Sequence, residues 1–129
     1  MAEETKRKTL GLVAHDGLKP AMLAWVKEHQ RKLANFDLFC TGTTGGQIAE
    51  AHPKLSVTRL KSGPLGGDQQ LGALIAEGKL DALVFLVDPM SPHPHDVDVK
   101  ALNRLCLVYD IPCANNTATA DLIIKGLKV

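Results

Sequence analysis

Short apolar runs alternate with longer amphipathic stretches five times along the chain. The apolar runs predict strands at 9–14, 37–40, 57–60, 82–87 and 112–114. The stretches that follow them predict helices at about 18–33, 45–51, 67–77, 96–109 and 118–125. Five strand–helix units with short connections predict an α/β fold: a five-stranded parallel sheet with helices on both faces, in a flavodoxin-like three-layer sandwich.

Two histidines, His29 and His52, have no obvious companions in the sequence. His29 shares one face of the first predicted helix with Met22, Val26 and Leu33, at helical spacing. We therefore expect His29 and His52 to be ordinary helix-face or surface residues.

Length and charge restrict the class of protein. The 129 residues fit one globular domain spanning 1–129, and 45% hydrophobic with 22% charged residues excludes a disordered chain. A formal net charge of +1 offers no broad basic face for nucleic acid or an anionic membrane. Any preference for an anion must come from a local site.

The sequence also predicts a cytoplasmic protein. The first eight residues are charged and lack the apolar stretch of a signal peptide, and no run is long enough to span a membrane. Cys40, Cys106 and Cys113 are odd in number and show no C-x-x-C spacing. We interpret them as buried thiols in a reducing compartment, with chemical reactivity as the alternative.

Polar side chains concentrate where the predicted strands end. Because ligands of open parallel sheets bind beyond the carboxyl ends of the strands, this edge is the candidate site. The helix-to-strand turns of the opposite edge, at 34–36 and 79–81, are plain by comparison. The segments at the carboxyl edge are His15–Lys19, Thr41–Gly45, Ser62–Asp68, Asp88–Asp98 and Asn115–Thr119.

Two glycine-rich segments, TGTTGG and SGPLGGD, each follow a strand and open a helix. Backbone N–H groups, a helix dipole and threonine hydroxyls together suit a phosphate group. An ordinary helix cap is the alternative for either segment alone. Their combination with Lys19 favours anion binding. Neither segment has the pattern of a nucleoside-triphosphate or dinucleotide site, so nucleotides are disfavoured.

Two acidic segments allow more than one interpretation. Asp68 lies in the first turn of a predicted helix, where it could be a capping carboxylate or a general base. The HPHDVD segment offers His93, His95, Asp96 and Asp98 to a metal. Its prolines keep the two histidines extended, so hydrogen bonding is favoured over metal binding. Asp98 could likewise be an acid in the first turn of its helix.

Taken in order, these segments resemble methylglyoxal synthases over nearly the whole chain. The matching blocks are LVAHD at 12–16, TGTTG at 41–45, SGPLGGDQQLGALIAEGKLD at 62–81, HDVDVKAL at 95–102 and NTATAD at 116–121. Longer members of that family continue past the position of Val129 with a C-terminal tail, and members are homo-oligomers, typically hexamers.

The resemblance implies a cofactor-free, metal-free carbon–oxygen lyase that converts dihydroxyacetone phosphate to methylglyoxal and inorganic phosphate. It implies that Asp68 is the general base, that His95 polarises the carbonyl or moves protons between oxygens, and that Asp98 is a second catalytic carboxylate. It also implies that inorganic phosphate inhibits. The substrate and phosphate contacts it implies are His15, Lys19, Thr41, Gly42, Thr43, Thr44, Ser62, Gly63 and His95.

Three other functions compete with this interpretation. The same fold serves as an effector-binding regulatory domain in carbamoyl phosphate synthetases, and such a domain needs no Asp68. A metal-assisted hydrolase would use His93, His95 and Asp98, and a chelator would inactivate it. A phospho-acceptor receiver needs an acidic pair after its first strand, which His15-Asp16 does not supply.

Overall fold

The chain folds around one sheet of five strands in a computed structural model that describes residues 7–90 and 96–127. The strands are β1 (Lys8–Ala14), β2 (Phe36–Thr41), β3 (Ser56–Leu60), β4 (Ala82–Leu86) and β5 (Cys113–Ala114). The helices are α1 (Lys19–Glu28), α2 (Gln30–Leu33), α3 (Gly42–Ala51), α4 (Gly67–Ala76), α5 (Asp96–Val108) and α6 (Thr117–Gly126). Two short 3₁₀ turns, η1 (Asp16–Leu18) and η2 (Gly63–Leu65), precede α1 and α4.

All neighbouring strands pair in parallel, in the order β3-β2-β1-β4-β5. The chain therefore builds outward from β1 to β3, then crosses to the other side of β1 to form β4 and β5. The change of direction lies between β1 and β4, and ligands of such sheets bind at the carboxyl ends of the strands at this point. The predicted α/β sandwich with five parallel strands is confirmed, but its flavodoxin-like topology is not. A flavodoxin-like sheet has the order 2-1-3-4-5, whereas here β1 is the central strand.

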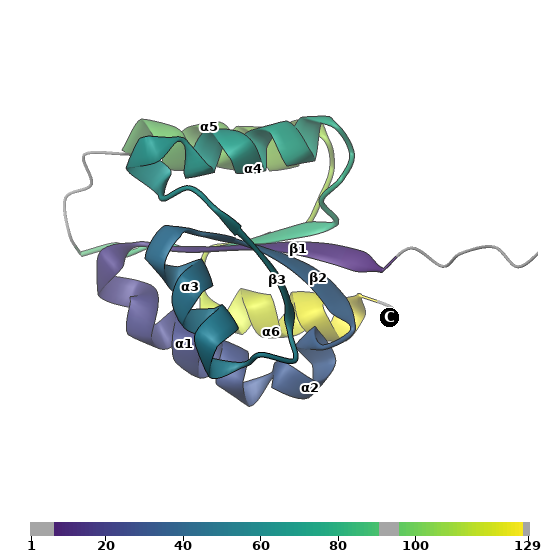
Figure 1. Ribbon diagram of the computed structural model, residues 1–129. Coiled ribbons are helices and arrows are strands. Elements are labelled where there is room, and N and C mark those ends of the chain that lie inside the picture. Colours follow the sequence, from purple (N-terminus) through teal and green to yellow (C-terminus); the bar gives the residue numbers. More distant parts are fainter. Residues whose placement is uncertain (1–6, 91–95, 128–129) are drawn as a thin grey trace, which may run out of the picture.

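Two apolar clusters lie on the two faces of the sheet. Helices α1, α2, α3 and α6 cover one face, and α4 and α5 cover the other (Figure 1). Helix α1 contributes Met22, Trp25 and Val26 to the first cluster, whereas α4 contributes Leu71 and Ile75 to the second. Strand β4 is buried along its whole length, as its uniformly apolar sequence predicts.

The predicted helix at 18–33 is divided. The structure has η1, then α1, an interruption at His29, and the short helix α2. His29 is not solitary as expected, because its Nε2 lies 3.0 Å from Asp121 Oδ1 on α6. The Trp25 indole donates to the same oxygen at 2.9 Å, and its ring lies 4.9 Å from the His29 ring. These three side chains join α1 to α6, a contact between residues far apart in sequence.

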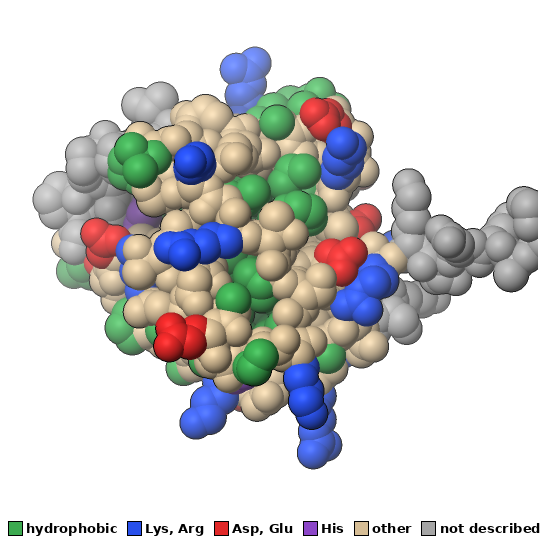
Figure 2. Space-filling model, viewed as in Figure 1, with side chains coloured by type: hydrophobic (Ala, Val, Ile, Leu, Met, Phe, Trp, Pro, Cys, Tyr) green, Lys and Arg blue, Asp and Glu red, His purple; other side chains and the backbone are tan. Residues whose placement is uncertain are grey.

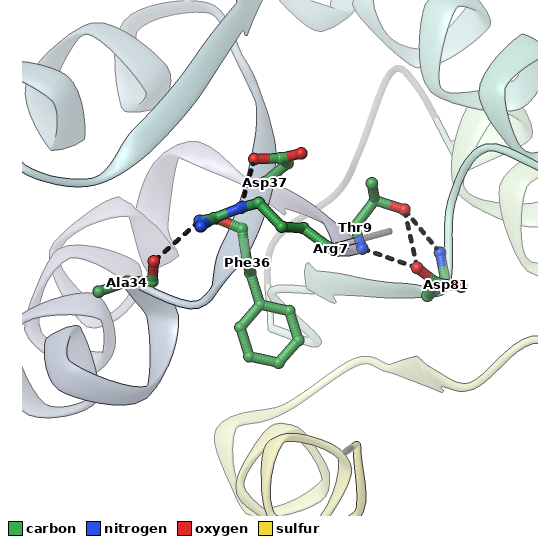
Figure 3. A network of polar contacts seen from close by, with 6 residues as sticks. All are labelled: Arg7, Thr9, Ala34, Phe36, Asp37 and Asp81. Atoms are coloured by element: carbon green, nitrogen blue, oxygen red, sulfur yellow. Dashed lines mark hydrogen bonds and ion pairs between the residues drawn. The ribbon is translucent and has the colours of Figure 1, made fainter. Parts of the chain in front are cut away.

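The amino edge of the sheet is more polar than its turns suggested (Figure 3). Asp81 accepts a hydrogen bond of 2.7 Å from the Thr9 backbone N–H and one of 3.2 Å from the Thr9 hydroxyl. Arg7 donates to Asp37 at 2.9 Å and to the carbonyl oxygens of Ala34 and Phe36 at 2.8 Å. The expectation of a plain edge was therefore wrong, and these groups hold β1 beside β2 and β4.

The surface shows no strong charge segregation on the face seen in Figure 2. Lysine and arginine side chains are spread over that face among acidic and apolar ones. Across the part of the chain that the structure describes, no helix is both long enough and apolar enough to cross a membrane.

Candidate active site

The TGTTGG segment forms the first turns of α3, which begins at Gly42 and not near Gly45 as predicted. Gly42 has a φ of +50°, a conformation that costs glycine little. The N–H groups of a first helical turn have no intrahelical acceptor, so they are available to an anion. Of the three threonines here, Thr43 is exposed, whereas Thr41 and Thr44 are 7% and 1% exposed.

The segment after β3 packs directly on this turn. A β-carbon built on Gly42 would lie 2.9 Å from both Cα and Cβ of Ser62, so only glycine allows this approach. The Ser62 carbonyl then accepts backbone hydrogen bonds from Leu65 at 3.0 Å and from Gly67 at 2.9 Å. The structure thus brings together the two glycine-rich segments that the sequence predicted to share a site.

Asp68 is buried beside this junction, with 7% of its surface exposed. It is the second residue of α4, and the residue preceding the helix is Gly66, with a φ of +108°. Asp68 is therefore not the N-cap residue. Its carboxylate lies over Gly63, where a built β-carbon would be 3.3 Å from Oδ2. The position near the helix N-terminus favours the ionised carboxylate.

His15 lies at the carboxyl end of β1, next to β4. Its Nδ1 accepts a hydrogen bond of 3.1 Å from the Asp88 backbone N–H. Nδ1 therefore carries no proton, and a neutral ring holds its proton on Nε2 as a donor. The ring edge packs on Phe85 with a centroid separation of 5.2 Å. This contact spans the point where the strand order changes direction.

Asp88 is a site residue that the sequence interpretation did not single out. It follows β4 by two residues, and its Oδ2 would lie 2.6 Å from a β-carbon built on Gly17. The Asp88 Oδ1 also accepts the Met90 N–H at 3.0 Å. Its place directly after a buried strand was the available signal.

Lys19 is held at the start of α1 by an ion pair with Asp16, at 2.9 Å. The hydrogen bond and charge of Lys19 lower the pKa of the Asp16 carboxyl below its ordinary 3.8. The Asp16 side chain is almost fully exposed and that of Lys19 is about one-third exposed. The ammonium is thus placed on the carboxyl edge, within reach of solvent.

Arg59 is a second residue of the candidate site that the sequence interpretation did not single out. Its Nε donates to the Gly42 carbonyl at 2.9 Å, and its guanidinium lies against Gly46, whose built β-carbon would be 3.0 Å from Cζ. The guanidinium therefore reinforces the positive potential at the start of α3. A single arginine on an edge strand gives no sequence signal for this contact.

His93, His95 and the Asp98 side chain lie outside the residues and side chains that the structure describes. The roles expected of them therefore stay predictions. Over the described ranges, no group of three or more His, Cys, Asp or Glu side chains is placed to hold a metal ion.

The chain is similar in sequence and in fold to known proteins. The MGS-like domain model matches residues 21–115. A methylglyoxal synthase of Brucella anthropi is 58% identical over 95% of this chain and 98% of its own. One from Pseudoalteromonas atlantica is 62% identical over 93% of this chain and 88% of its own. The crystal structure of methylglyoxal synthase from Elizabethkingia anophelis superposes with a TM-score of 0.86, at 50% identity, covering 93% of this chain and 78% of that one.

The fold and the carboxyl-edge site define a three-layer α/β domain with a polar site at its strand crossover. The family match and the identities above show that the chain belongs to the MGS-like family, among the methylglyoxal synthases.

Proposed function

We propose that this chain converts dihydroxyacetone phosphate to methylglyoxal and inorganic phosphate, as a carbon–oxygen lyase. The observation that carries the proposal is the junction at Gly42, Ser62 and Gly63. There a buried carboxylate, Asp68, lies beside a helical turn suited to phosphate. A base next to a phosphate subsite is what proton abstraction from a small phosphorylated ketone requires.

In the first step, the Asp68 carboxylate removes a proton from the carbon next to the substrate carbonyl. Negative charge then develops on the carbonyl oxygen, and an enediolate forms. We assign its stabilisation to His95 and to His15, whose ring tautomer is set by the Asp88 N–H. Preorganised donors at a developing oxyanion contribute about 3–4 kcal/mol each.

The second step ends in methylglyoxal: the hydroxyl on the deprotonated carbon loses its proton and becomes the aldehyde, and the methylene carbon that phosphate leaves takes up a proton. The step begins when the electrons of the enediolate expel phosphate and the carbon–oxygen bond to phosphate breaks. Elimination prevails over reprotonation only if that bond lies out of the enediolate plane, where it overlaps the π system. A cradle that holds the phosphate from several sides sets this torsion, which is orientation used for catalysis. Thr43, Ser62, Lys19 and the first N–H groups of α3 provide the cradle. Asp98 serves as a second carboxylate near the reacting carbons.

The same proposal extends to assembly and location. An apolar surface suited to contact with further copies lies at the end of α5, where Leu107 and Val108 are 82% and 64% exposed. We expect a homo-oligomer, a hexamer as is typical of the resembling family, acting in the cytoplasm without a cofactor. Inorganic phosphate is expected to bind the cradle and to inhibit.

The test is to incubate the purified chain with dihydroxyacetone phosphate and to measure methylglyoxal and phosphate together. We expect equal amounts of the two products, no effect of a chelator, and competitive inhibition by added phosphate. Turnover that disappears on chelation and returns with zinc would favour a metal-assisted hydrolase. Phosphate without methylglyoxal would refute the elimination.

A further inference from the structure

Two of the three cysteines, seven positions apart in sequence, lie together where α5 leads into β5. Cys106 is in the last turn of α5, and Cys113 begins β5. The chain reverses between them through Asp110, which has a φ of +54°, and Ile111 donates back to the Cys106 carbonyl at 3.0 Å. Both side chains join the apolar cluster under α4 and α5.

The two thiols lie close enough for each to shift the pKa of the other. The Cys113 thiol also contacts Asn103, one turn before Cys106 on α5, donating to its Oδ1 at 3.4 Å. Cys106 is 3% exposed, whereas Cys113 is only half-buried, which corrects the expectation that all three thiols are buried. Cys113 is thus the more accessible residue of the pair, and Cys106 is the buried one.

The electrostatic environment divides the pair into an attacking and a resolving thiol. Interaction with the Cys106 thiol lowers the pKa of Cys113, whereas interaction with Cys113 and burial raise the pKa of Cys106. Cys40 gives the contrast: it lies in the other cluster, and burial raises its pKa to about 12. Because the thiolate is the reactive form, Cys113 is the thiol that an oxidant reaches first.

We propose that Cys106 and Cys113 are a redox site that a hydroperoxide converts to a reversible intramolecular disulfide. The Cys113 sulfur attacks the peroxide, whose O–O bond breaks, giving a sulfenic acid and an alcohol, or water from hydrogen peroxide. The Cys106 sulfur then attacks the sulfenic sulfur; the S–S bond forms, the S–O bond breaks and water leaves. The two thiols lose two electrons in total, and the peroxide gains them.

The disulfide would remove the Cys113 donation to Asn103. Asn103 contacts Asn115 at 3.5 Å, and Asn115 in turn donates to the Phe85 carbonyl at 3.0 Å. Asn103 and Asn115 line a hollow of about 560 Å³, together with Val87 and Pro89 on either side of Asp88. The redox site is therefore linked, through two asparagines, to the segment that follows β4.

The test uses the full chain, treated with stepwise additions of hydrogen peroxide, quenched in acid with N-ethylmaleimide and digested with trypsin. Both cysteines fall in one tryptic peptide, 105–125, whereas Cys40 falls in 33–54. We expect the first peptide to carry no alkyl groups and to be two hydrogens lighter than its dithiol form. Reduction with dithiothreitol should restore the two thiols and their alkylation. The Cys40 peptide should remain alkylated.

Two variants and a second probe sharpen this result. Cys113→Ser should abolish the peptide change, whereas Cys40→Ala should leave it intact. Phenylarsine oxide, which bridges paired thiols, should bind the wild-type chain with 1:1 stoichiometry and should not bind Cys113→Ser. Sulfinic acid on Cys113 with Cys106 still alkylated, or disulfide-linked dimers, would overturn the proposal. The wild-type peptide map decides the question even if Cys113→Ser does not fold.

Discussion

The two edges of the sheet are both polar, but they use their polar groups differently. At the amino edge, Asp81 accepts the Thr9 backbone N–H and Arg7 donates to backbone carbonyls, so side chains there complete the hydrogen bonding of the strands. At the carboxyl edge, Asp68 and Asp88 lie against the Cα atoms of glycines, where no side chain intervenes. Substitutions at the first edge should therefore change stability, and those at the second should change turnover.

The largest expected effect is at the carboxyl edge. Asp68→Asn keeps nearly the same shape but cannot accept a proton, so the turnover number should fall by about 10²–10⁴ or more. Phosphate binding should persist, because the cradle is unchanged. In deuterated water, solvent exchange at the reacting carbon of dihydroxyacetone phosphate should fall along with product formation.

Asp98→Asn is the matched control for this prediction. It should lose less activity if Asp98 orients His95 or the substrate and does not take the proton. Exchange that survives in Asp68→Asn but disappears in Asp98→Asn would transfer the base role to Asp98. The contrast between the two edges would remain, with a different carboxylate as the base.

The second prediction concerns the amino edge. Asp81→Ala leaves the half-buried Thr9 N–H without its acceptor, which should lower the free energy of unfolding by about 1–3 kcal/mol. Turnover of the folded fraction should be unchanged. Urea unfolding and the assay, run on the same sample, measure both. Asp81→Asn, which keeps a side-chain oxygen, should recover most of the stability; a loss of turnover in either variant would contradict the division between the edges.

The sheet and most element boundaries could be predicted because apolar runs and amphipathic periods are local in sequence. The strand predicted at 37–40 is Phe36–Thr41 in the structure, and the helix predicted at 67–77 is Gly67–Ala76. The start of α3 was missed because glycine and threonine disfavour a helix interior. In this first turn Gly42 instead adopts a positive φ against Ser62. That contact comes from tertiary packing.

The candidate site was predictable as a set of segments, and less so as a set of contacts. Topology alone places the strand ends at one edge, so Ser62, Gly63 and Asp68 were found from their order along the chain. Asp88 and Arg59 contact residues distant in sequence: the Asp88 backbone N–H donates to the His15 ring, and the Arg59 side chain donates to the Gly42 carbonyl. No local pattern reveals such pairs. The Asp81–Thr9 bonds were missed for the same reason.

A smaller effect is expected from the phosphate cradle. Thr43→Ala removes the one exposed hydroxyl among the threonines at the start of α3, so affinity for substrate and for phosphate should fall together, each by about tenfold. Thr43→Ser should restore both. Thr58→Ala, at an exposed position on β3, is the control. If the substrate affinity fell while the phosphate inhibition constant did not change, Thr43 would contact another part of the substrate.

The smallest expected effect is at the Asp16–Lys19 ion pair, which joins stability to the site. The lowered pKa of Asp16 means that its contribution to stability is complete above the ordinary carboxyl pKa of 3.8 and is lost as the pH falls through the lower folded value. Near neutral pH, Asp16→Asn should therefore unfold slightly more easily than the wild type. The difference should disappear in acid. Because Asp16 is almost fully exposed, it should be small at every pH.

The same substitution should act in the opposite direction on phosphate binding. Asp16 pairs with the Lys19 ammonium at 2.9 Å, so a bound phosphate must compete with the carboxylate for it. Asp16→Asn removes that competitor, and phosphate should bind more tightly at neutral pH, by no more than about fivefold for an exposed pair. Isothermal titration with phosphate measures the change, and added salt should reduce it. Weaker phosphate binding in Asp16→Asn would show instead that the carboxylate orients Lys19 toward the ligand.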